Sequence, residues 1–116
     1  MGGGSRWSPV EETVLLYFNS IGVQHEACAA LITLKCDRPR NVIGVRHKLK
    51  DLRKKHPSLW DVNTQKWNLD AVDKWLLDQD ILNLQRFLSL DQEEEKRVVK
   101  VRLMSQHLMF STCLQY

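Results

Sequence analysis

The residues of this chain that could do chemistry are mostly basic, and they gather in one stretch. Between Arg38 and His56, eight lysines and arginines accompany a single acid, Asp51, so this segment carries a net charge of +7 while the whole chain of 116 residues carries +3. A basic stripe separated from the acidic residues is the electrostatic footprint of a surface that binds phosphate. The eight basic residues are Arg38, Arg40, Arg46, Lys48, Lys50, Arg53, Lys54 and Lys55.

The phase of this stretch on a helix separates an outward face from two flanks. At about 100° per residue, one side is apolar and can be buried, through Val42, Val45, Leu49 and Leu52. The opposite side is predicted to contact base edges in the major groove of DNA, through Arg40, Ile43, His47, Lys50 and Lys54. Contacts with phosphates are predicted for Arg38, Arg46, Lys48, Arg53 and Lys55.

Ile43 and Gly44 bear on the choice between DNA binding and plain solvation. An isoleucine within an exposed basic face needs an apolar partner, and a thymine methyl group is one. Gly44 has no side chain, which would let the backbone approach a partner closely. The alternative interpretation is that the basic face is only solvated and that Ile43 packs under a loop. We prefer nucleic-acid binding because the basic residues are segregated.

Other side chains that could bind a metal or carry out catalysis form no recognisable site. The chain has three cysteines, an odd count that does not suggest a disulfide framework and favours a reducing compartment. His25, Cys28 and Cys36 lack an obvious fourth ligand for a structural zinc ion, and the glutamates at 93–95 point in different directions on a helix. No motif supplies a nucleophile or a phosphate-binding glycine loop. We therefore expect no catalytic residue, no metal and no cofactor, and we expect that the chain is not an enzyme.

Helix signals predict the elements that would carry the basic face. Ser8 and Glu11 surround a proline and form a helix start in which each side chain satisfies a free backbone N–H group. A second helix is expected from about Gln24 to Leu34. The basic helix is expected to begin near Arg40 and to reach Lys54 or Lys55. The residues that we expect to be buried together between these helices are Trp7, Phe18, Leu31 and Leu49.

Further elements are predicted after the basic helix. Residues 59–67 suit a short hairpin or an ordered loop packed by its tryptophans. Asn68 is expected to cap a fourth helix, whose core-facing residues would be Leu69, Val72, Leu76 and the neighbouring Trp75. Helices are also expected at 80–90 and from Asp91 onward, while residues 97–104 suit a helix or a strand, with helix preferred. The expected fold class is all-α, with a three-helix core, a tryptophan-containing extension and further C-terminal helices.

The chain is expected to divide into three parts. Residues 1–5 are expected to be a leader or linker outside the fold, in a chain that is itself a fragment. Residues 6–79 would be the DNA-binding domain, and residues 80–116 a helical partner or dimerisation segment. Residues 90–114 are rich in apolar side chains, which need cover. We favour pairing with a second copy of the chain, and the alternative is an intramolecular helix that enlarges the core.

The opening helix and the basic third helix carry a family resemblance. The chain from residue 7 to residue 16 places a tryptophan, a small capping residue, an acidic pair and two leucines in order, as Trp7-Ser8-Pro9-Val10-Glu11-Glu12-Thr13-Val14-Leu15-Leu16. This order resembles the opening of Myb/SANT-like, homeodomain-like helix-turn-helix repeats, and the resemblance covers about Arg6 to His56. It implies a three-helix fold whose third helix lies in the major groove. SANT-type relatives often bind histone tails or other proteins, so the resemblance also implies a second class of ligand.

Together these features predict a sequence-reading module that binds double-stranded DNA, in a nuclear regulator of transcription or chromatin. The alternative is a SANT-type module that binds a histone or another chromatin protein without reading DNA sequence. We expect no membrane association, because no apolar run approaches the ~20 residues of a membrane span.

Overall fold

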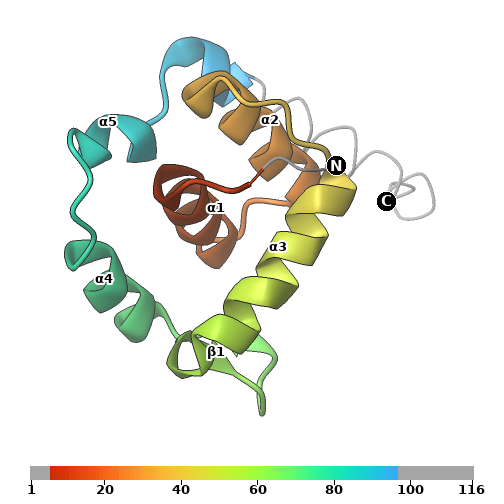
Figure 1. Ribbon diagram of the computed structural model, residues 1–116, viewed down its shortest axis with the longest axis vertical. Coiled ribbons are helices and arrows are strands. Elements are labelled where there is room, and N and C mark those ends of the chain that lie inside the picture. Colours follow the sequence, from red (N-terminus) through yellow and green to blue (C-terminus); the bar gives the residue numbers. More distant parts are fainter. Residues whose placement is uncertain (1–5, 97–116) are drawn as a thin grey trace, which may run out of the picture.

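The computed structural model describes residues 6–96, and in this range the chain is mostly helical with one small two-stranded sheet. Figure 1 shows α1 in the middle of the fold, with the other helices around it, and α1 contacts each of them. Residues 92–96 are helical as well. The elements are α1 (Pro9–Ser20), α2 (His25–Cys36), α3 (Val42–Lys55), a 3-10 turn (Pro57–Leu59), β1 (Trp60–Asp61), β2 (Lys66–Trp67), α4 (Leu69–Leu77) and α5 (Leu84–Leu88).

The start of α1 confirms the predicted capping box. The Glu11 backbone N–H donates to Ser8 Oγ at 3.2 Å, and the Ser8 backbone N–H donates to Glu11 Oε1 at 3.0 Å. Pro9 occupies the first turn, where its missing N–H costs nothing. These contacts fix the N-terminal end of α1 and hold the Glu11 side chain in a single orientation.

Helix α1 is buried on two sides, which explains its central place. Its Val14, Leu15 and Phe18 side chains join a core formed with α2 and α3, and its Leu16 joins a second core with Leu59, Val72 and Leu76. The predicted cluster is confirmed: Phe18, Leu31 and Leu49 are at most 2% exposed in one core, and Trp7 packs against it half-buried.

The basic helix begins later than predicted. Its cap is Asn41, whose Oδ1 accepts the Gly44 backbone N–H at 2.8 Å. Arg40 precedes the helix, and its backbone N–H donates to Thr33 Oγ1 at 3.1 Å. Helix α2 is correspondingly longer and reaches Cys36, after which Asp37 turns the chain with a φ of 54°. The expected start near Arg40 was therefore wrong by two residues, because Asn41 is the better helix cap.

The tryptophan-containing stretch forms the predicted short hairpin. Trp60 pairs with Trp67 across two antiparallel strands, and their rings meet edge to face with centroids 5.0 Å apart. Asn68 caps α4 as expected, since its side chain accepts the Ala71 backbone N–H. Val72 and Leu76 are buried, but Leu69 is 52% exposed, so its predicted place in the core is wrong. Leu69 is the first residue of α4 and lies outside the apolar stripe.

The chain after α4 packs back onto the first helices. Helix α5 is shorter than the predicted helix at 80–90, because Asn83 precedes it with a left-handed φ of 59°. Phe87 and Leu90 pack against the core of α1, α2 and α3. The Lys35 Nζ lies 2.8 Å from Glu94 Oε1, which ties residues 92–96 to α2.

Residues 80–96 thus contact the part of the chain predicted as the DNA-binding domain, and the division at Gln79 stays a prediction. The predicted leader at 1–5, the choice between helix and strand at 97–104 and most of the expected dimerisation segment lie outside the described residues.

Candidate nucleic-acid interface

The candidate interface is the side of α3 that faces away from the protein. Its inward side is fixed by Val45, Leu49 and Leu52, which are at most 1% exposed. Its outward side carries an apolar residue, Ile43, at 61% exposure among basic side chains. We call this set the outward face, and it consists of Ile43, Arg46, His47, Lys50 and Lys54, all exposed. Within residues 6–96, none of its four polar side chains forms an ion pair or a hydrogen bond.

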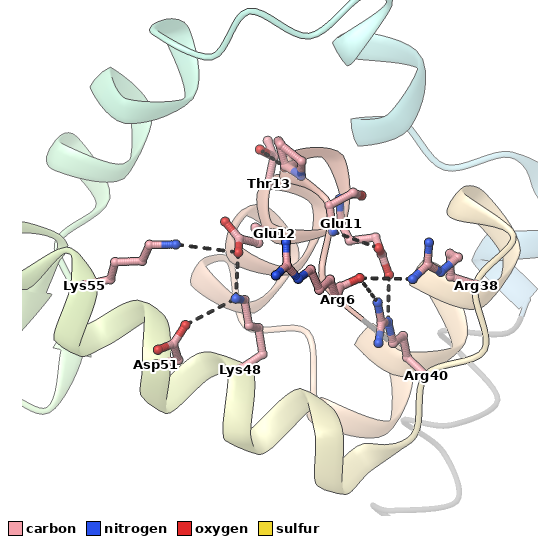
Figure 2. A network of polar contacts seen from close by, with 11 residues as sticks. Arg6, Glu11, Glu12, Thr13, Arg38, Arg40, Lys48, Asp51 and Lys55 are labelled. Atoms are coloured by element: carbon pink, nitrogen blue, oxygen red, sulfur yellow. Dashed lines mark hydrogen bonds and ion pairs between the residues drawn. The ribbon is translucent and has the colours of Figure 1, made fainter. Parts of the chain in front are cut away.

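The structure places four of the five predicted base-reading residues on this face, and the exception is Arg40. The Arg40 Nε lies 2.7 Å from Glu11 Oε2, and its guanidinium stacks over the Trp7 ring at 4.4 Å from the centroid. The same guanidinium donates to the Arg6 carbonyl, as Figure 2 shows. With its side chain only 8% exposed, Arg40 is a structural residue and does not share the outward face.

Glu11 explains why Arg40 turns inward. Glu11 is completely buried, and burial would raise the pKa of its carboxyl. The hydrogen bond from Arg40, followed by those from Ser8 and the nearby Arg40 charge, outweighs burial and holds the pKa of Glu11 below its ordinary value. Arg38 is also drawn to this end of α1, because its guanidinium donates to the Arg6 carbonyl at 3.0 Å.

On one flank of α3, the positive charges are partly compensated by Glu12, the residue of α1 that follows Glu11. The Lys48 Nζ lies 2.6 Å from Glu12 Oε2 and 3.2 Å from Asp51 Oδ2, and the Lys55 Nζ lies 3.9 Å from the same Glu12 oxygen (Figure 2). Burial would lower the pKa of Lys48, but Glu12 and Asp51 together raise it above its ordinary value. Both predicted phosphate contacts on this side, Lys48 and Lys55, are therefore partly compensated within the protein.

The other flank keeps its positive charge. Arg46 is exposed, and the Arg53 guanidinium lies over the Trp60 ring at 4.8 Å from the centroid, a contact that positions the charge without neutralising it. These charges also affect the pKa of His25, at the start of α2. Burial is the main cause that lowers its pKa, and the charges of Arg46 and Arg53 lower it further. The charges of Arg46 and Arg53 therefore act as far as the start of α2.

The ion pairs of Glu11 and Glu12 with basic residues were not predicted from the sequence. Glu11 was expected only in the helix cap and Glu12 was given no partner, although an acidic pair in one helix and a basic run in another can meet in space. The usable signal was the number of basic residues, which exceeds what one outward face can hold. Which of them pair with the acids depends on how α1 crosses α3, and helix periodicity does not determine that crossing.

The cysteine thiols in the described part of the chain are poor nucleophiles. Burial raises the pKa of Cys28 to about 12 and, as the largest cause, that of Cys36 to about 11, so both stay protonated near neutral pH. Across residues 6–96, no three histidine, cysteine or acidic side chains come together as metal ligands. No helix there combines the length and the apolar character needed to cross a membrane.

Comparisons with known proteins add no relative. A scan against protein-family models, a search of curated proteins and a search of solved structures each found no match.

Proposed function

We propose that this chain is a DNA-binding module in which α1, α2 and α3 form a helix-turn-helix of the Myb/SANT-like kind and α3 enters the major groove. The observation that supports the proposal most is the selective pairing of basic residues. Arg40 and Lys48 are held by acids of α1, whereas Arg46, His47, Lys50 and Lys54 stay unpaired within residues 6–96. Unpaired basic side chains that lie side by side do not stabilise the fold, but they do form a surface to which a polyanion such as DNA binds.

The outward face has the composition that base reading needs. Lys50 can donate to guanine O6 and N7, and the exposed Ile43 can contact a thymine methyl group. The inward side of α3 is locked in the core, so these side chains project from a rigid support. We propose a nuclear regulator of transcription or chromatin as the setting for this activity.

The two flanks of α3 differ in charge, so DNA phosphates should bind one flank more strongly than the other. Glu12 compensates Lys48 and Lys55, so phosphates gain less on that side than next to Arg46 and Arg53. We therefore propose that one DNA strand runs along the Arg46 and Arg53 flank. Arg40 is left out of this interface, because the buried Glu11 compensates its charge, whereas the exposed Arg38 donates to a neutral carbonyl and keeps its charge.

A selection from random duplexes tests the proposal. A reading module enriches one sequence family, and each favoured base pair is worth about 1–3 kcal/mol over the wrong one. Recovery of duplexes without any shared sequence would exclude base reading.

The second candidate function is a SANT-type module that docks on an acidic protein surface. The compensated flank favours it, because Glu12 leaves fewer basic side chains to grip two DNA strands. Both candidates depend on salt, and only the first discriminates between duplexes of equal length and different sequence.

A homodimer is proposed as well, since a short monomeric module reads few bases. Leu90 and Glu94 already pack within their own chain, so pairing would depend on the part of the predicted segment 90–114 that follows Lys96. Sedimentation of the full chain beside a chain that ends at Lys96 tests this. Equal monomeric masses at high micromolar concentration would exclude the dimer.

A further inference from the structure

The hairpin of β1 and β2, which follows α3, is anchored to the helices by side-chain contacts, and its tip is exposed to solvent. Trp60 contacts both the Arg53 guanidinium, which lies over its ring, and the Trp67 ring, which meets it edge to face. The Trp67 Nε1 donates to Asn19 Oδ1 at 2.9 Å, which anchors the hairpin to the end of α1. The tip itself, residues 62–66, is exposed, and Val62 is 68% exposed.

The shape of the tip is fixed by its own polar contacts. Asp61 Oδ1 accepts the backbone N–H groups of Asn63 and Thr64, and the Gln65 backbone N–H donates to the Asp61 carbonyl at 2.8 Å. The Asp61 carboxylate is thus used internally. Asn63, Thr64 and Lys66 keep side-chain donors that bind nothing else within residues 6–96. A preformed turn with unused donors loses little conformational freedom when it binds a partner.

The hairpin lies where a DNA strand would pass. Helix α3 has 14 residues and is therefore about 21 Å long, while the major groove is about 12 Å wide. Ile43 to Lys50 span about 10 Å along the helix axis, so they fit within a groove that α3 enters at an angle, with Arg46 and Arg53 toward one strand. Lys54 and the hairpin, which Figure 1 shows at the C-terminal end of α3, then lie beyond it, next to the sugar–phosphate backbone.

We propose that the hairpin tip is a second DNA contact, which grips the sugar–phosphate backbone beside the groove that α3 reads. Lys66, Asn63 and Thr64 donate to phosphate oxygens, and Val62 packs against the deoxyribose edge. The Arg53–Trp60 contact joins the two sites, because it fixes the hairpin to the flank of α3 that keeps its positive charge. This inference rests on the proposed DNA binding by α3.

A matched pair of double variants of the full chain tests the hairpin. The tip variant is Thr64→Glu with Lys66→Glu, and the control is Leu82→Glu with Arg86→Glu on the α5 side. Each removes one positive charge and adds two negative charges at exposed positions. Thermal unfolding of both is compared with that of the original chain. Affinity, salt dependence and hydroxyl-radical footprints are then measured on the duplex that the original chain selects.

The tip variant should lose about tenfold more affinity than the control, and its salt slope should fall by about 0.9 for each lost phosphate contact. Its footprint should shorten at one end only, with the preferred central bases unchanged. Equal losses in the two variants and equal footprints would overturn the hairpin contact alone. If the original chain gives no footprint on any duplex, the proposed function fails, and the hairpin contact fails with it.

Discussion

The Arg40 Nε lies 2.7 Å from Oε2 of Glu11, a carboxylate that is completely buried at the start of α1. This pair joins α1 to the residue that precedes the cap of α3, and the Trp7 ring covers the guanidinium. Arg40 was predicted to read DNA bases, but this ion pair makes it a structural residue that links α1 to the start of α3. We call the Arg40–Glu11 pair the clamp.

Replacing Arg40 with alanine should therefore destabilise the fold. The substitution leaves the Glu11 carboxylate buried without its charged partner, which costs about 3 kcal/mol or more. Chemical denaturation measures the change. The matched control is Lys50→Ala, which removes an unpaired exposed charge from α3 and should leave the free energy of unfolding within about 0.5 kcal/mol of the original value. Equal effects of the two substitutions would contradict the clamp.

The same pair gives stability a predictable dependence on pH. The pKa of Glu11 lies below its ordinary value of 4.5 in the folded chain. Its contribution is therefore fully present above the unfolded pKa and is lost as pH falls through the lowered folded pKa. Below about pH 4.5, the original chain should lose stability more steeply than Glu11→Gln. If the free energy of unfolding changes with pH in the same way in both proteins, Glu11 is not the source of this pH dependence.

Helix α1 should be sensitive at its buried aromatic residue. Phe18 is 2% exposed within the core of α1, α2 and α3. Phe18→Ala should cost roughly 3–5 kcal/mol, a large share of the stability of a small domain. Thermal unfolding checks this, with the exposed Ile21→Ala as a control that should change stability little. An unchanged unfolding temperature in Phe18→Ala would mean that α1 packs through another face.

Removing the Glu12 charge, which compensates Lys48 and Lys55, should strengthen DNA binding. Glu12→Gln frees Lys48 and Lys55 from the acid of α1, so phosphates can bind them. Affinity should rise, and the salt slope should steepen by up to about 0.9 for each new phosphate contact. Asp73→Asn removes one negative charge from an exposed position on α4 and is the control. If both variants bind equally, Glu12 influences binding only through net charge.

Local signals in the sequence predicted the elements well, because each is set by neighbours along the chain. The capping box at Ser8 and Glu11, the Asn68 cap and the apolar stripe of Val45, Leu49 and Leu52 all depend on residues within a turn or two. The outward residues Ile43, His47, Lys50 and Lys54 follow from the same periodicity.

The errors arose where distant segments meet. Arg40 was assigned to a helix that Asn41 caps and Val42 begins, and its partner Glu11 lies in another helix. Phe87 and Leu90 likewise pack against a core formed by the first three helices, which no local signal indicates. A helix pattern shows which side chains share a face, but not which helix covers that face.

Base reading by the outward face is the central claim, and one comparison of selections tests it most directly. Random duplexes are selected with the original chain, with the double variant His47→Ala, Lys50→Ala and with the exposed α4 control Lys74→Ala. The account predicts one enriched sequence for the original chain and the control, and for the double variant a preference weakened by about 1–3 kcal/mol at the bases that these side chains contact. The same enriched sequence, with the same strength of preference, from all three proteins would contradict it.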